Sequence, residues 1–176
     1  LSGLYRPLLE EQEEDKIDIS QIIDKDKKIF SIYPGSRLSE IKVLLPILFK
    51  FVELMNKKYS NMFFIFHSTF DHNQLIKNLL LKERFENCEV ITDEKIKSYI
   101  LKKSIFAVAK SGTISLEICN AKVPSVIIYK MSKINFFIIK NLVKVKSPNI
   151  INITADEEII PELLQSKCNP NDIFKT

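Results

Sequence analysis

The sequence predicts an α/β protein with a Rossmann-like open parallel sheet and helices on both faces. Two observations predict this fold. Short, continuously apolar runs recur along the chain, as is typical of strands that are covered on both faces. Helical patterns separate these runs, and strands that alternate with helices form parallel sheets. With 176 residues, of which 45% are hydrophobic, the chain is long enough to bury the core of one domain.

The expected elements follow one another in regular order. We expect strands at Ile29–Tyr33, Met62–His67, Cys88–Ile91, Ile105–Ala109 and Ser125–Tyr129. We expect helices at residues 39–59, 72–85, 93–104, 113–122, 132–146 and 155–167. Pro46 and Pro161 fall inside helical patterns, where proline predicts a kink or a late start.

Charge divides the chain into two parts. Residues 1–26 hold eight acidic and three basic residues, and we interpret them as an acidic linker or residual inter-domain segment. Residues 27–176 carry a net charge of +9 and form the expected Rossmann-like domain. A basic domain suits either phosphate-bearing partners or an anionic lipid surface, and charge alone does not choose between them.

Several classes of protein are disfavoured by the composition. The sequence has no run of 18 apolar residues and no signal-peptide pattern near its start, so a cytoplasmic location is expected. Cys88, Cys119 and Cys168 lie far apart, which favours reduced thiols over a metal site. His67 and His72 lack further ligands nearby and are expected on the surface or in loops. We therefore expect no metal and no cofactor.

The stretch "YPGSR" follows the first expected strand and precedes a helix. Ligands of parallel sheets bind at the carboxyl ends of the strands, which is where this turn lies. Gly35 lets the backbone approach a ligand, Ser36 offers a hydroxyl, and Arg37 carries donors suited to phosphate oxygens. The alternative is an ordinary tight turn with a surface arginine.

A second stretch, "AKSGTISLE", repeats this arrangement after another expected strand. Ser111, Gly112 and Thr113 form the turn, and Thr113 is expected to cap the next helix. Glu117 lies one helical turn further on, where its carboxylate could accept hydrogen bonds from two ribose hydroxyls. Two such turns at one sheet edge favour a nucleotide. Neither the Walker lysine pattern nor GxGxxG occurs, which argues against ATPases and dinucleotide-binding enzymes.

Four stretches together resemble the C-terminal half of the lipid-A-disaccharide synthase family. They are, in order, "YPGSRLSEI", "AKSGTISLEICNAKVPSVIIYK", "SPNII" and "PELLQSKCNP". The family consists of GT-B glycosyltransferases with two Rossmann-like domains, from Gram-negative bacteria. The resemblance covers about residues 27–174. It implies transfer of 2,3-diacylglucosamine from UDP to 2,3-diacylglucosamine 1-phosphate in lipid A biosynthesis.

The resemblance also implies roles for individual residues. Those matching the family's UDP-binding turns are Gly35, Ser36, Arg37, Ser111, Gly112, Thr113 and Glu117, with Glu117 on the ribose. Asn149 and Gln165 match residues that border the same cleft. The family's general base and acceptor site are expected in an N-terminal domain that this sequence does not include. We accordingly expect no catalytic residue here, and no activity from this chain alone.

The resemblance defines the expected partners as well. They are the UDP moiety of UDP-diacylglucosamine, the N-terminal domain and an anionic membrane, at the inner face of the inner membrane. A homodimer is possible. Nucleic acid is not expected as a partner, because most aromatic residues fall in apolar runs. Two alternatives remain: the nucleotide-binding domain of another GT-B transferase or UDP-sugar epimerase, and a basic binding module without catalytic activity.

We predict salt-sensitive membrane binding from residues 130–146. This stretch has five lysines and no acidic residue, with apolar residues at helical spacing. A basic amphipathic helix is attracted to anionic lipid by about 1 kcal/mol per lysine near the surface. The chain should co-sediment with anionic vesicles at low salt, and changing Lys140 and Lys144 to glutamate should weaken this. A chain that stays in the supernatant at low salt would support the alternative, a helix that packs on the core.

Overall fold

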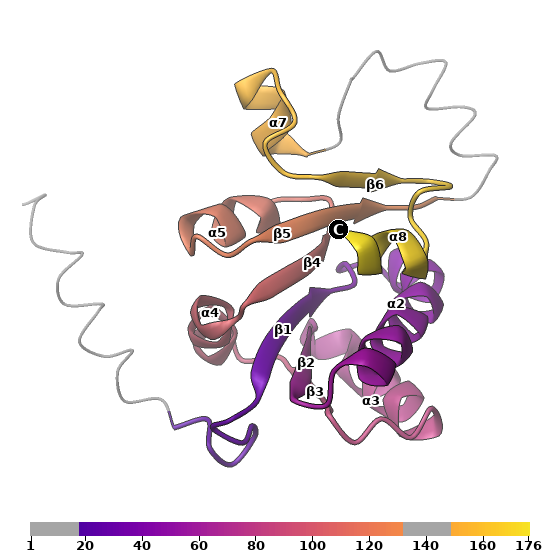
Figure 1. The fold of residues 1–176 in the computed structure, drawn as a ribbon, viewed down its shortest axis with the longest axis vertical. Coiled ribbons are helices and arrows are strands. Elements are labelled where there is room, and N and C mark those ends of the chain that lie inside the picture. Colours follow the sequence, from indigo (N-terminus) through magenta and orange to yellow (C-terminus); the bar gives the residue numbers. More distant parts are fainter. Residues whose placement is uncertain (1–17, 132–148) are drawn as a thin grey trace, which may run out of the picture.

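The computed structural model describes residues 18–131 and 149–176, and its centre is a parallel six-stranded sheet (Figure 1). The strand order is β3-β2-β1-β4-β5-β6, and every neighbouring pair is parallel. The strands are β1 (Lys28–Tyr33), β2 (Met62–His67), β3 (Cys88–Ile91), β4 (Phe106–Lys110), β5 (Ser125–Tyr129) and β6 (Glu162–Leu164). The predicted Rossmann-like sheet is confirmed, and its first five strands agree with the expected ones to within a residue at each end.

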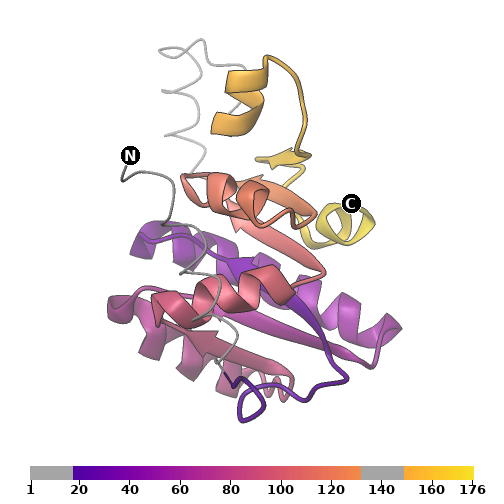
Figure 2. The same ribbon diagram turned by 90° about the vertical axis from the view of Figure 1, so that its left-hand side faces the viewer.

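Helices cover both faces of the sheet (Figures 1 and 2). The helices are α2 (Leu38–Lys58), α3 (Asn73–Lys82), α4 (Glu94–Lys103), α5 (Ile114–Asn120), α7 (Ile150–Ala155) and α8 (Pro170–Lys175), with a short 3-10 helix, η1 (Phe70–His72), before α3. One face carries α2, α3 and α8, and the other carries α4 and α5. α2 begins before Pro46, so this proline does not delay the helix.

Aromatic side chains fill the larger core, beneath α2. Phe30 lies at its centre, with ring centroids 5.5 Å from Phe64, 5.9 Å from Phe106 and 6.4 Å from Phe51. Cys168 and Ile173, which are distant in sequence, belong to the same core. The strands bury residues on both faces, which explains why their sequences are continuously apolar.

The opposite face has two smaller cores, under α4 and α5. One of them includes Ile23, which is 4% exposed and packs with Ile29, Ile65 and Ile100. The acidic segment 1–26 therefore contributes an apolar side chain, that of Ile23, to the core of the domain.

The prediction of a helix at residues 155–167 is wrong. α7 ends at Ala155, Asp156 takes the left-handed conformation (φ 55°), and β6 pairs in parallel with β5. Pro161 lies directly before β6, and its carbonyl accepts from the Ile127 amide. Proline lacks an N–H group, so it is tolerated at the start of an edge strand and disrupts the middle of a helix.

The helix α8 was not expected from the sequence, although the sequence contains its start signal. Asn169 is the N-cap, and its side chain accepts from the Asp172 amide at 3.0 Å. Pro170 occupies the first helical position, where its fixed φ suits a helix and its missing N–H costs nothing. α8 packs against α2 (Figure 1).

Two sequence predictions lie outside the described residues. The first is the helix expected at 132–146, which makes up most of the lysine-rich stretch 130–146. The second is the acidic segment 1–26, of which residues 1–17 are not described. Among the described residues, no helix is long and apolar enough to cross a membrane.

We predict that the aromatic core dominates stability. Phe64→Ala should lower the free energy of unfolding by about 3–5 kcal/mol, because the fully buried ring leaves a cavity. Phe70 is 85% exposed and is the matched control, so Phe70→Ala should change the value by less than about 0.5 kcal/mol. Urea unfolding followed by circular dichroism measures both. Equal losses for the two variants would contradict this assignment of the core.

Candidate functional site

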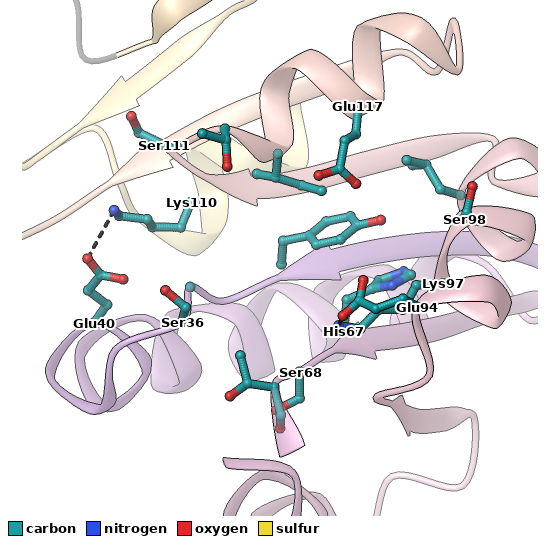
Figure 3. Close-up of a pocket in the computed structure, with 17 residues that line it drawn as sticks. Ser36, Glu40, His67, Ser68, Glu94, Lys97, Ser98, Lys110, Ser111 and Glu117 are labelled. Carbon is teal, nitrogen blue, oxygen red and sulfur yellow. Dashed lines mark hydrogen bonds and ion pairs between the residues drawn. The ribbon is translucent and has the colours of Figure 1, made fainter. Parts of the chain in front are cut away.

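The two glycine turns meet at one pocket because β1 and β4 are neighbours. Their register pairs Tyr33 with Ala109, so both strands end at the same edge of the sheet. The pocket beyond this edge has a volume of about 380 Å³ (Figure 3). Of the residues predicted to bind UDP, those that line it are Gly35, Ser36, Ser111, Gly112, Thr113 and Glu117.

Gly35 fits its turn for conformational and steric reasons. Its φ is +103°, a region that side chains other than hydrogen rarely adopt. A Cβ placed on it would lie 2.7 Å from Oε2 and 3.2 Å from Cβ of Glu40, in the first turn of α2. The turn therefore packs tightly against the Glu40 side chain.

Glu40 links two basic side chains at this end of the pocket. Its Oε1 lies 3.0 Å from Lys110 Nζ (Figure 3) and 3.7 Å from Arg37 Nη1. The Lys110 side chain is 19% exposed, whereas that of Arg37 is 80% exposed and does not line the pocket. The sequence motif pointed to Arg37 and not to Lys110. The position of Lys110 in the sequence was a usable signal, because this lysine lies between the expected strand Ile105–Ala109 and the turn that begins at Ser111.

The second turn differs from expectation in its hydrogen bonds. Thr113 occupies the N-cap position of α5, but its side chain makes no capping hydrogen bond. Instead, the Ser115 hydroxyl donates to the Gly112 carbonyl at 2.8 Å. Ser111 is buried, while Gly112 and Thr113 are exposed to the pocket. The hydroxyl of Thr113 is therefore not committed to a cap.

Glu117 and Tyr33 both line the pocket. Glu117 is exposed, and in Figure 3 it extends from α5 into the pocket. Burial raises the pKa of Tyr33, against the lowering effect of a hydrogen bond with Ser31, and the carboxylates of Glu117 and Glu94 raise it further. Tyr33 is therefore a neutral hydroxyl.

His67 lies at the far end of the pocket and is buried, so its expected surface position is wrong. It is 4% exposed, and its ring stacks on Tyr33 with centroids 4.1 Å apart and an interplanar angle of 11°. Burial lowers the pKa of His67 to about 3, and the positive charge of Lys97 adds to this effect. Lys97 itself donates to Glu94 at 2.8 Å. The contacts of His67 join residues that are far apart in the sequence, so the sequence alone could not predict them.

The two remaining predicted cleft residues lie outside the lining of this pocket. Asn149 is the buried N-cap of α7, and its Oδ1 accepts from the Ile151 amide at 3.1 Å. Gln165 directly follows β6 with φ 51°, and its backbone N–H donates to the Tyr129 carbonyl at 2.9 Å. Their contact with a ligand stays a prediction.

The pocket combines donors for an anion with acceptors for hydroxyl groups. Lys110 and the hydroxyls of Ser36, Ser111 and Thr113 lie at the glycine turns, and the carboxylate of Glu117 also lines the pocket. Across residues 18–131 and 149–176, no group of three or more histidine, cysteine, aspartate or glutamate side chains is placed to hold a metal ion.

Solved structures share this fold. The ADP-heptose lipopolysaccharide heptosyltransferase II of E. coli matches with a TM-score of 0.64 at 10% identity, over 94% of this chain and 50% of that one. The UDP-GlcNAc 2-epimerase of Neisseria meningitidis, solved with UDP-GlcNAc, matches with a TM-score of 0.52 at 18% identity, over 97% and 48%. At such identities the likeness establishes the fold alone.

Sequence comparison identifies the family. The lipid-A-disaccharide synthetase family model matches residues 6–175. The lipid-A-disaccharide synthase of Persephonella marina is 40% identical over 156 residues, which are 87% of this chain and 41% of that protein. The chain spans less than half the length of the curated relatives that it matches first. The match includes both glycine turns and covers almost the full length of the sequence. The chain therefore belongs to the lipid-A-disaccharide synthetase family.

Proposed function

We propose that the pocket binds the UDP moiety of UDP-2,3-diacylglucosamine. The observation that carries this proposal is the convergence of both glycine turns and Glu117 on one pocket, in a chain of this family. The epimerase with the similar fold was solved with UDP-GlcNAc, which supports a nucleotide sugar as the ligand class. The diphosphate would lie at the two turns beside Lys110, and the ribose hydroxyls would bond to Glu117.

We further propose that the chain is the donor-binding part of a transferase. The acceptor would be 2,3-diacylglucosamine 1-phosphate, whose hydroxyl attacks the anomeric carbon while the bond to the UDP oxygen breaks. Negative charge then develops on the departing diphosphate. Lys110 and the donors of the glycine turns would stabilise that charge without a metal ion. The acceptor site and general base would come from the part of the longer relatives that this chain does not cover.

The other candidate classes have less support. A UDP-sugar epimerase shares the fold, but family membership favours the transferase. A membrane location is a further proposal, resting on the acylated substrates and on the lysines of residues 130–146. The vesicle experiment described above tests it.

Lys110 should contribute more to UDP affinity than Arg37. Lys110→Met should weaken binding about ten- to a hundredfold, because a charge-assisted hydrogen bond is lost and Glu40 then faces the phosphates without its partner. Arg37→Met should weaken it less, since its side chain is largely solvated.

Isothermal titration calorimetry with UDP measures these changes, and Lys82→Met on α3 is the matched control. The double variant Lys110→Met, Glu40→Gln should recover part of the loss, because it removes both charges. If Lys110→Met binds UDP like the control, the diphosphate does not lie beside Lys110.

Glu117 should recognise the ribose. Glu117→Gln should lower the affinity for UDP about tenfold, because a neutral amide accepts hydroxyl hydrogen bonds more weakly than a carboxylate does. Binding of 2′,3′-dideoxyuridine diphosphate, which lacks both hydroxyls, should hardly change. Glu53→Gln, on the exposed side of α2, is the control for charge. An equal loss for both nucleotides would contradict the assigned role.

A further inference from the structure

Two residues that line the pocket carry buried polar atoms with no hydrogen-bond partner within the described chain. The atoms are Nδ1 of His67 and Oγ1 of Thr69. Buried polar side-chain atoms are nearly always hydrogen-bonded in folded proteins. Two such atoms in the lining of one pocket therefore point to a ligand that supplies the missing partners.

A chain of hydrogen bonds fixes the proton of His67. The Ser104 hydroxyl donates to the Ile100 carbonyl at 2.9 Å. Its oxygen then accepts from the Ser31 hydroxyl at 2.8 Å, and the Ser31 oxygen accepts from His67 Nε2, also at 2.8 Å. Each hydroxyl has one proton to donate, so this direction satisfies all three bonds. The Nε2–H form leaves Nδ1 as a hydrogen-bond acceptor.

Packing holds the imidazole in this orientation. Tyr33 stacks on one face of the ring, and the bond to Ser31 fixes one edge. The low pKa of His67, caused by burial, keeps the ring neutral at physiological pH. A neutral and orientated ring can discriminate between a donor and an acceptor in a ligand, because a mismatch leaves a buried polar atom without a partner.

The order of residues along the pocket suggests which part of a nucleotide lies here. Figure 3 shows Lys110, Ser36 and Glu40 at one end, and His67, Lys97 and Glu94 toward the other, with Glu117 on the opposite side of the pocket from His67 and Glu94. On the function proposed above, the diphosphate occupies the first end and the ribose bonds to Glu117. The nucleobase then falls beside His67.

We propose that His67 selects uracil by accepting a hydrogen bond from its N3–H at Nδ1, with the Thr69 hydroxyl bonding to a neighbouring carbonyl. This inference rests on the proposed binding of UDP. Uracil presents an imide N–H between two carbonyl oxygens, which complements an acceptor beside a hydroxyl. Cytosine presents an unprotonated N3 in the same place. It would set two acceptors against each other and leave both without a hydrogen bond.

The experiment compares UDP with CDP by isothermal titration calorimetry of the 176-residue chain. The wild-type chain should bind UDP at least about tenfold more tightly than CDP. His67→Gln should bring this ratio close to one, because a glutamine amide can still reach Ser31 but places no acceptor at the position of Nδ1. The second histidine of the chain, His72, lies outside the pocket, and His72→Gln should leave the ratio unchanged.

The outcomes separate the two proposals. If the wild-type chain binds neither nucleotide, the proposed function fails and this inference fails with it. If it binds UDP and CDP equally, or if His67→Gln keeps the wild-type preference, the role of His67 is wrong and UDP binding stands.

A second measurement covers the case in which His67→Gln does not fold. In the nitrogen-15 spectrum of wild-type chain labelled at histidine, the unprotonated Nδ1 resonance of His67 should shift when UDP is added. CDP at equal saturation should not produce this shift. An Nδ1 resonance that is unchanged at UDP saturation would overturn the proposal.

Discussion

The parallel pairing of β1 with β4 is the constraint on which the pocket depends. The chain first extends the sheet from β1 to β3 and then returns to the opposite side of β1 with β4. At this point the two strands end side by side, and the crossovers leave the edge in opposite directions. The turn after Tyr33 and the turn after Lys110 are therefore adjacent although they are far apart in sequence. Without this pairing, Glu40 could not reach Lys110, and Glu117 would not line the same pocket as Tyr33.

Charge compensation is a second property of the pocket. Each of its two lysines lies beside a carboxylate, Lys110 beside Glu40 and Lys97 beside Glu94. A lysine that is already held in place loses less conformational entropy when it binds an anion, but it must share its charge with the carboxylate. The balance differs at the two ends because Glu40 is 16% exposed and Glu94 is 84% exposed. Water screens Glu94 well, whereas the Glu40 carboxylate acts on Lys110 through less solvent.

Local patterns predicted the main strands, the long helices and both glycine turns, because these depend on neighbouring residues. The three residues of β6 are too few to show the alternation of apolar and polar residues that marks a strand, and the sequence pattern predicted a helix at this place. The cap formed by Asn169 and Pro170 was present in the sequence and was not used. The partners in the site could not be predicted in the same way. His67 is hydrogen-bonded to Ser31, which lies 36 positions before it, and Ser31 is in turn bonded to Ser104, which lies 73 positions after Ser31. These three residues meet only in the folded sheet.

The packing of α8 on α2 affects the order in which the domain can be completed. Cys168 and Ile173 are fully or almost fully buried in the same core as Phe30 and Phe64, which lie more than a hundred positions earlier. The larger core is therefore complete only after these late residues have been synthesised. The smaller cores under α4 and α5 use only earlier residues, apart from Ile160 and Ile151. The chain thus supplies almost all of the residues for one face of the sheet before it supplies the last residues for the other.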